Sequence, residues 1–194
     1  MHRLVLILGG VRSGKSRFAQ ELAQRLGGQE VLFVATAQAG DDEMRRRIDE
    51  HRRSRPAAWT TLEQPLETGL AILALESPPL VILVDCLTLL VSNAMLQCEG
   101  DAEAAQRQVT AETQSLIAAA RQQRATMIIV SGEVGQGVVP ESSLGRLFRD
   151  LLGWANQMLA HEAEATYLMV AGLAIEVRSL AVSIEQAAGG LRTK

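Results

Sequence analysis

The chain has 194 residues, of which 47% are hydrophobic and 21% are charged, and this length and composition are typical of one folded α/β domain spanning residues 1–194. The formal net charge of -3 argues against a general nucleic-acid binder, and an aromatic content of 3% offers no platform for stacking single-stranded bases. The longest apolar region, residues 80–91, is interrupted by Asp85 and is too short to span a membrane, so we expect a soluble protein.

A short apolar run at residues 4–8 predicts a buried strand, and a phosphate-binding loop follows it directly. The loop fits the Walker A pattern and consists of Gly9, Gly10, Val11, Arg12, Ser13, Gly14, Lys15 and Ser16. Its glycines let backbone N–H groups turn toward a phosphate chain, and apolar periodicity over residues 17–26 predicts the helix that follows. Lys15 would contact the β and γ phosphates, and Ser16 would bind a bridging Mg²⁺. The alternative is a glycine-rich turn that binds nothing.

A second buried strand is predicted at residues 31–35, and a charged segment at residues 41–55 predicts a helix that ends at Pro56. In that helix, acids at 41–43 precede arginines at 45–47 by four residues, a spacing that favours ion pairs. His51 shares one stripe with Met44 and Ile48. The acids and most of the arginines therefore lie on the other faces.

His51 is the candidate nucleophile of the chain. Arg52, Arg53 and Arg55 surround it with positive charge, which favours the neutral imidazole and leaves a ring nitrogen free to attack phosphorus. The same arginines could bind triphosphate oxygens. Two alternatives stay open: a histidine satisfied within the core, and a solvated arginine face paired with its own acids.

The remaining pattern alternates strands with helices. We expect strands at residues 59–62, 80–84 and 126–130, helices at 65–75, 87–96, 102–124 and 142–160, a closing hairpin at 166–170 and 173–177, and an irregular tail at 187–194. In the helix at 142–160, Leu144, Leu147, Phe148, Leu151 and Leu152 should face inward. This alternation predicts a mostly parallel sheet with helices on both faces, and a ligand site along the carboxyl edge of its strands.

Several acids end the predicted strands at this edge. Asp85 follows an apolar strand as in the Walker B pattern and could reach Mg²⁺, or it could instead cap the helix that begins at residue 87. Glu63 and Glu133, the latter in the glycine-rich loop at 131–140, are candidate acids or exposed loop carboxylates. Cys86 and Cys98 lack metal-ligand spacing, which indicates free thiols and a cytoplasmic location. His2 and His161 should lie on the surface.

The chain resembles the bifunctional adenosylcobinamide kinase/adenosylcobinamide-phosphate guanylyltransferase family of cobalamin biosynthesis. The resemblance rests on colinear motifs at residues 9–16, 35–37, 47–56, 59–63, 84–88, 132–141 and 148–150. It implies a RecA-like P-loop fold, a homotrimer, a corrinoid substrate, and the use of GTP, ATP and Mg²⁺.

The resemblance also implies two reactions. A nucleoside triphosphate phosphorylates the aminopropanol hydroxyl of adenosylcobinamide, and GTP then guanylylates a histidine, here His51, from which the substrate phosphate takes GMP. The implied nucleotide site comprises residues 9–16, Ala35, Thr36, Ala37, Arg52, Arg53, Ser54, Arg55, Glu63 and Asp85, with Ser16 and Asp85 as metal ligands.

Two other functions stay open at this point. A simple P-loop small-molecule kinase would have no covalent step and a structural His51. A guanine-nucleotide switch or NTPase module would bind partners instead, but the chain has no Asn-Lys-x-Asp motif for recognising guanine, which counts against it.

Overall fold

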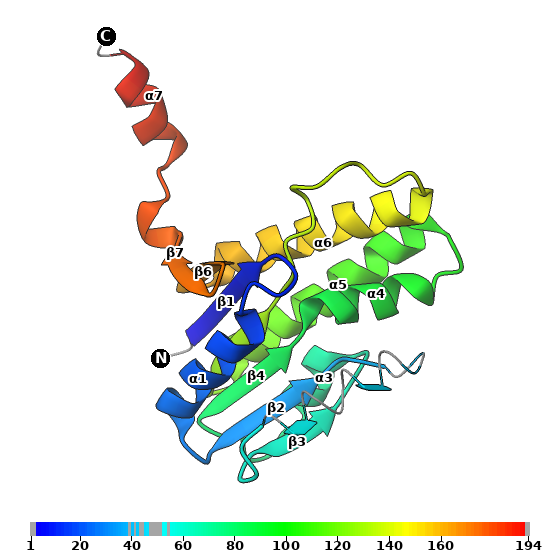
Figure 1. Cartoon of the computed structure of the whole chain (residues 1–194), viewed down its shortest axis with the longest axis vertical. Coiled ribbons are helices and arrows are strands. Elements are labelled where there is room, and N and C mark those ends of the chain that lie inside the picture. Colours follow the sequence, from blue (N-terminus) through cyan, green and yellow to red (C-terminus); the bar gives the residue numbers. More distant parts are fainter. Residues whose placement is uncertain are drawn as a thin grey trace.

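The computed structural model describes residues 3–38, 40, 42, 45–46, 52–53 and 55–192, with backbone alone at 190–192. Within these residues, seven strands form one sheet in the order β3-β2-β4-β5-β1-β6-β7 (Figure 1). The paired strands β1 to β6 are parallel, and β7 is antiparallel to β6. The strands are β1 (Arg3–Gly9), β2 (Val31–Ala35), β3 (Thr60–Glu63), β4 (Val81–Asp85), β5 (Thr126–Val130), β6 (Ala165–Val170) and β7 (Leu173–Glu176).

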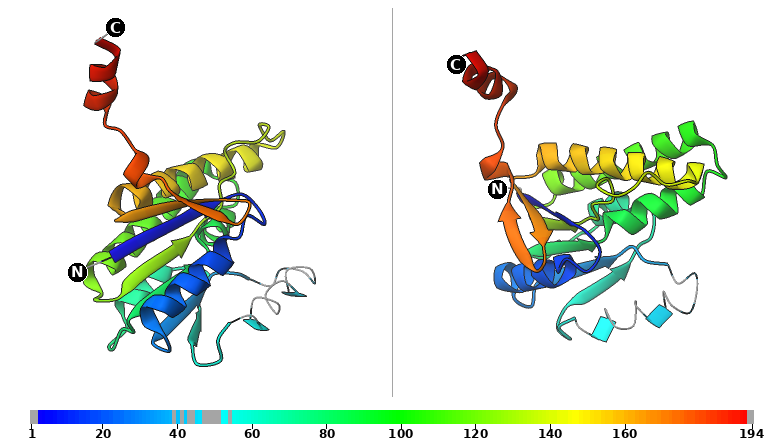
Figure 2. Two further views of the ribbon diagram at one scale, coloured as in Figure 1. Left: turned by 60° about the vertical axis from the view of Figure 1, so that its left-hand side comes forward. Right: turned by 45° about the horizontal axis from the view of Figure 1, so that its top comes forward.

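Helices cover both faces of the sheet, as the sequence predicts (Figures 1 and 2). The described helices are α1 (Lys15–Gly27), α3 (Thr68–Leu73), α4 (Leu87–Leu96), α5 (Ala102–Gln122), α6 (Ser143–Glu162), the 3-10 turn η1 (Arg178–Leu180) and α7 (Ile184–Arg192). Buried residues of α3, α4, α5 and α6 share one core cluster with the sheet, and those of α1 share the other. The three-layer α/β sandwich is thereby confirmed.

Strand β1, which lies between β5 and β6, shows why helices must cover both faces of the sheet. Leu4 and Leu6 belong to the core beneath α4, α5 and α6, whereas Val5 and Ile7 belong to the core beneath α1. Successive side chains of a strand point to opposite faces, so a continuous apolar run is stable only when both faces are buried.

The strand register brings the carboxyl ends together at one edge of the sheet. Ala35 at the end of β2 pairs with both Glu63 of β3 and Asp85 of β4, and Asp85 pairs with Val130 of β5. Ile7 of β1 also pairs with Val130, two residues before the glycine-rich turn. The sheet therefore aligns the residues that precede each candidate site segment.

Three predictions of the fold are wrong in part. Helix α3 begins at Thr68 rather than at residue 65, because Gln64 N still donates to Ala35 O at 2.8 Å and Glu67 adopts a left-handed φ of 51°. Leu144 is exposed instead of buried, because the first turn of α6 extends beyond the sheet (Figure 1).

The third wrong prediction concerns the tail, where residues 184–192 form α7 rather than an irregular segment. Ser183 and Gln186 bond reciprocally, with side-chain-to-backbone distances of 2.8 and 3.2 Å. This is a capping box, a pattern that is visible in the sequence.

The predicted helix at residues 41–55 lies largely outside the described residues. Asp42, Arg45, Arg46, Arg52 and Arg53 are helical, and Arg45 pairs with Asp42 at 3.2 Å. His2 also falls outside the described residues, and His161 is exposed as expected. Among the helices that the structure describes, none is both long and apolar enough to cross a bilayer.

Candidate functional site

The phosphate-binding loop connects β1 to α1 and has a backbone that only glycine adopts easily at its two ends. Gly9 has a φ of 151° and Gly14 a φ of 97°. A Cβ atom added to Gly9 would lie 2.6 Å from Met169 O, so the loop is packed directly against β6. Two backbone bonds hold it from outside: Glu133 N donates to Gly9 O at 3.0 Å, and Gly172 N donates to Ser13 O at 2.9 Å.

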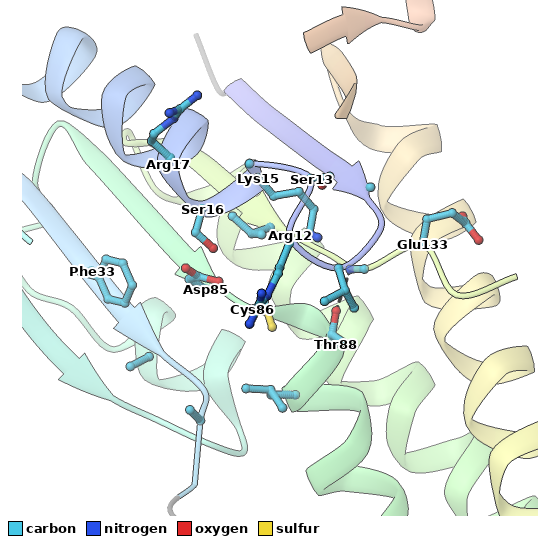
Figure 3. A pocket seen from close by; sticks show the side chains of 18 of the residues that line it. Arg12, Ser13, Lys15, Ser16, Arg17, Phe33, Asp85, Cys86, Thr88 and Glu133 are labelled. Atoms are coloured by element: carbon cyan, nitrogen blue, oxygen red, sulfur yellow. Dashed lines mark hydrogen bonds between the residues drawn. The ribbon is translucent and has the colours of Figure 1, made fainter. Parts of the chain in front are cut away.

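A cavity of about 770 Å³ opens beside this loop, a size typical of sites for small ligands (Figure 3). Its walls come from the P-loop, from the carboxyl ends of β2, β3, β4 and β5, from the start of α4 and from the arginines near residues 45–55. Segments far apart in the sequence therefore meet at the predicted edge of the sheet.

Lys15 and Asp85 supply opposite charges at the centre of the cavity. Lys15 Nζ donates to Gly10 O at 2.6 Å, which leaves two of its three N–H donors for a ligand. Burial lowers the pKa of Lys15, and the carboxylate of Asp85 is among the groups that oppose this shift. The hydroxyl of Ser16 and the carboxylate of Asp85 point toward one another (Figure 3). A hydroxyl and a carboxylate so placed are the protein ligands expected for a Mg²⁺ ion that also binds phosphates.

Asp85 does not cap α4. The N-cap position of this helix is occupied by Cys86, whose side chain forms no capping hydrogen bond, and Asp85 is the last residue of β4. The alternative role of Asp85 as an N-cap is therefore wrong.

The arginines form a second positive region of the cavity. Arg52 bonds to Glu63, and the guanidinium of Arg55 lies 3.7 Å from the centroid of the Phe33 ring. Burial lowers the pKa of Arg55 and the nearby carboxylate of Asp85 raises it, although a guanidinium stays protonated at neutral pH in any case. Stacking on Phe33 fixes the plane of Arg55, which favours forked contacts with phosphate oxygens.

Two donors that line the cavity have no protein partner. Ser13 Oγ and Arg55 Nε are both buried without a hydrogen bond. Because buried polar groups are nearly always satisfied, these atoms fit a ligand rich in acceptor oxygens, as a triphosphate is. No group of three or more His, Cys, Asp or Glu suited to a metal occurs within the described part of the chain.

Thr36 has a structural role and does not contact a ligand. It is fully buried and does not line the cavity. Its hydroxyl donates to Cys86 O at 2.7 Å and accepts from Cys86 N at 2.8 Å, and Asn93 Nδ2 donates to Thr36 O at 2.8 Å and to Pro65 O at 3.0 Å. This set of bonds, which we call the strand-end clasp, fixes the peptide next to Asp85.

The thiol of Cys86, which lines the same cavity, is held protonated. Burial raises its pKa to about 11, with the carboxylate of Asp85 acting in the same direction. A thiol that stays protonated at neutral pH is a poor nucleophile and a poor metal ligand. We therefore assign Cys86 a packing role.

The Thr36→Val variant tests the clasp. Valine has nearly the same shape but leaves Cys86 N without the partner seen here and Cys86 O with the bond from Leu90 N alone, so we expect a loss of about 1–3 kcal/mol in the free energy of unfolding. We also expect a decrease in phosphoryl-transfer kcat, because the position of Asp85 is loosened. Urea unfolding and steady-state kinetics measure these two effects.

Thr36→Ser, which keeps the hydroxyl, should restore both properties, and Thr60→Val on the exposed part of β3 is the matched control. A Thr36→Val protein with unchanged stability and kcat would contradict the role of the clasp.

The glycine-rich loop after β5 is anchored to its surroundings at several points. Gly132 N donates to Thr88 Oγ1 at 2.6 Å, and Asn156 Nδ2 donates to Gly132 O at 3.1 Å. Glu133 lines the cavity on the other side of Lys15 from Asp85, and its Oε1 accepts a bond of 2.6 Å from Gly135 N (Figure 3). Its carboxylate is therefore already used in shaping the loop.

Most of the sequence-predicted site residues come together at the cavity. Those that line it are Gly9, Val11, Arg12, Ser13, Gly14, Lys15, Ser16, Ala35, Ala37, Arg52, Arg55, Glu63 and Asp85. Gly10, Thr36 and Arg53 do not line it, and His51 and Ser54 lie outside the described residues. Phe33 and Thr88 also line the cavity and are not among the site residues predicted from the sequence. Phe33 could have been found, because it lies two residues before Ala35 on the same face of β2.

Comparison with known proteins gives the following matches. The family model described as cobinamide kinase / cobinamide phosphate guanyltransferase matches residues 5–177. The bifunctional adenosylcobalamin biosynthesis protein CobU of Escherichia coli is 40% identical over 182 residues, which cover 90% of this chain and 99% of the relative. The corresponding protein CobP of Pseudomonas aeruginosa is 42% identical over 173 residues, which cover 89% of this chain and 96% of the relative.

A similar solved structure is the ATPase domain of G40P. The TM-score is 0.51 at 14% sequence identity, and the match covers 86% of this chain and 69% of that one. Similarity at this level shows the fold alone, and it agrees with the P-loop architecture that the sequence predicts.

Proposed function

Because the chain belongs to the cobinamide kinase / cobinamide phosphate guanyltransferase family, we propose that it catalyses both reactions at the carboxyl edge of its sheet. In the first reaction a nucleoside triphosphate, ATP or GTP, phosphorylates the aminopropanol hydroxyl of adenosylcobinamide. In the second reaction GMP from GTP is transferred to the resulting phosphate. The observation that carries this proposal is the meeting of Lys15, Ser16, Asp85, Arg52 and Arg55 at one cavity.

In the kinase step, the protein mainly positions and neutralises the phosphates. The P-loop N–H groups and Lys15 bind the β and γ phosphates while the substrate hydroxyl oxygen attacks the γ phosphorus. The new P–O bond forms, the nucleoside diphosphate leaves with the electron pair of the broken P–O bond, and the hydroxyl proton passes to solvent. Ser16 and Asp85 would hold Mg²⁺, which would neutralise phosphate charge during the transfer. Ser13 Oγ and Arg55 Nε are donors that become satisfied when phosphate oxygens bind.

In the guanylyl step, we propose His51 as the nucleophile. A neutral ring nitrogen of His51 attacks the α phosphorus of GTP, a P–N bond forms, and pyrophosphate leaves with the electron pair of the broken P–O bond. An oxygen of the cobinamide phosphate then displaces the histidine. The described residues that flank His51 support this role, because Arg45 and Arg52 both line the cavity.

We propose a cytoplasmic homotrimer, as the family resemblance implies. Self-association is supported by the end of the sheet, where Leu173 and Ile175 of β7 are exposed, and by the exposed residues Leu180, Val182 and Ile184 that lead into α7. Helix α7 stands away from the rest of the chain (Figures 1 and 2). Exposed apolar surface of this kind is typical of a subunit interface in an oligomer.

The experiment is an assay of the purified protein with adenosylcobinamide, Mg²⁺ and either ATP or GTP, analysed by mass spectrometry. We expect adenosylcobinamide phosphate with a triphosphate donor and adenosylcobinamide-GDP when GTP is present. Light scattering on the same sample should give the mass of a trimer. Nucleotide hydrolysis without either corrinoid product would contradict the function, and would favour the switch or NTPase alternative.

A further inference from the structure

Arg12 has a backbone conformation in the phosphate-binding loop that an arginine adopts only at a cost. Its φ is 57°, in the left-handed region, and it is the third residue of a turn closed by a bond of 3.3 Å from Ser13 N to Gly10 O. Glycine is the usual residue at a left-handed third position of a turn, because a Cβ atom is strained there. Backbone strain of this kind is concentrated at functional sites. A side chain kept at this cost points to a function for the guanidinium of Arg12.

The turn is held in shape by backbone bonds on either side of Arg12. Gly9 O accepts from Glu133 N at 3.0 Å, and Ser13 O accepts from Gly172 N at 2.9 Å. Both donors belong to other segments of the chain, so the shape of the loop does not depend on the side chain of Arg12. Replacing that side chain should therefore leave the loop in place.

The side chain of Arg12 extends from the loop into the cavity, on the side where Asp85 and Cys86 lie (Figure 3). It is exposed, and it forms no hydrogen bond or ion pair with another residue that the structure describes. The other described arginines that line the cavity each have a partner, namely Glu21 for Arg17, Asp42 for Arg45, Glu63 for Arg52 and the Phe33 ring for Arg55. The N–H donors of Arg12 are thus available to a ligand in the cavity.

The side of the cavity that Arg12 enters indicates which phosphate it reaches. A carboxylate in the position of Asp85 and a P-loop lysine act on the same terminal phosphates of a nucleotide. A guanidinium that enters on the side of Asp85 is therefore directed at the γ phosphate. Negative charge on this group is redistributed during transfer, and an arginine from the same chain is an effective way to stabilise it.

We propose that Arg12 is a catalytic residue of the kinase step, and that its guanidinium binds the γ-phosphoryl group while that group is transferred. The hydroxyl oxygen of cobinamide bonds to the γ phosphorus, the bond from that phosphorus to the β–γ bridging oxygen breaks, and its electron pair stays with the nucleoside diphosphate. The hydroxyl proton passes to solvent. This inference rests on the proposed function and adds to it a residue that acts in the transition state rather than in nucleotide binding.

The test is the Arg12→Gly variant. Glycine adopts a φ of 57° without strain, so the variant should fold with a urea midpoint no lower than that of the wild type. We expect kcat of the kinase step to fall by about 10²–10³-fold, because one charged donor to the transferred group is lost, while KM for the nucleotide changes by less than about 3-fold.

Binding of a transition-state mimic provides a second measurement without turnover. The affinity of Arg12→Gly for a nucleoside diphosphate with aluminium fluoride should fall by a factor similar to that in kcat, whereas its affinity for a non-hydrolysable triphosphate should stay unchanged. Guanidinium chloride at a concentration too low to unfold the protein should restore part of kcat. A purely structural role of Arg12 would give neither result.

The matched control is Glu99→Gly, which makes the same change at another left-handed position. Glu99 has a φ of 47°, is exposed and does not line the cavity, so this variant should keep the wild-type kcat. If Arg12→Gly also keeps it, or if the nucleotide KM rises with an unchanged kcat, Arg12 is not a transition-state residue. Equal losses in affinity for the mimic and for the triphosphate would overturn the inference as well. If the wild-type protein forms no adenosylcobinamide phosphate, the proposed function fails and this inference with it.

Discussion

The His51→Ala variant is expected to form no covalent GMP adduct and to lose guanylyl transfer by at least about 10³-fold, because it lacks the nucleophile that accepts the guanylyl group. Wild-type protein incubated with GTP and Mg²⁺ should gain the mass of one GMP. A phosphoramidate is labile in acid and stable in alkali, so acid should remove this mass. The kinase reaction of His51→Ala should stay near the wild-type rate.

Loss of guanylyl transfer with retention of the kinase reaction in His51→Ala distinguishes the proposed function from a simple P-loop kinase. A simple P-loop kinase would give no adduct in either protein and normal phosphorylation in both. The matched control is His161→Ala, since His161 is an exposed histidine of α6 far along the chain from the cavity. An adduct that persists in His51→Ala would show that another residue is the nucleophile.

The Lys15→Met variant is expected to lose both reactions together, by about 10²–10³-fold in kcat/KM. Methionine keeps most of the length of the side chain but none of its charge, and the sequence contains one other lysine, Lys194. Burial already lowers the pKa of Lys15, so replacing its ammonium removes a partly desolvated charge. Steady-state kinetics of each reaction measure the loss.

The free energy of unfolding of Lys15→Met shows whether Lys15 acts in the reaction or in holding the fold together. The sole hydrogen bond of its ammonium that the structure describes is to Gly10 O, within the loop. We therefore expect urea unfolding of Lys15→Met to differ from wild type by less than about 1 kcal/mol. A variant that retains one of the two reactions would contradict a shared phosphate site.

The sequence predicts those parts of the fold whose signal is local. The strands β2 and β5 and the helix α4 have the predicted bounds, because apolar runs and turn residues lie within the segments themselves. The P-loop is likewise defined by eight consecutive residues, and the acids at strand ends follow from where parallel strands end.

The features that were not predicted depend on partners distant in sequence. The family resemblance implies that Thr36 contacts the nucleotide, whereas its hydroxyl bonds to Cys86, fifty residues later. Thr88 and Asn156 hold Gly132 from two different helices, and no local pattern indicates this. The prediction that Leu144 faces inward is wrong for a similar reason, because helical periodicity does not show where the sheet beneath the helix ends.

The hairpin β6–β7 contacts the phosphate-binding loop as well as forming the end of the sheet. Gly172 in its turn donates to Ser13 O, and Met169 packs against Gly9. A neighbouring copy that alters this turn on packing would also alter the free energy with which the loop binds phosphate. By thermodynamic reciprocity, the nucleotide would then change the strength of assembly by the same factor, so that protein concentration and nucleotide affinity become coupled variables.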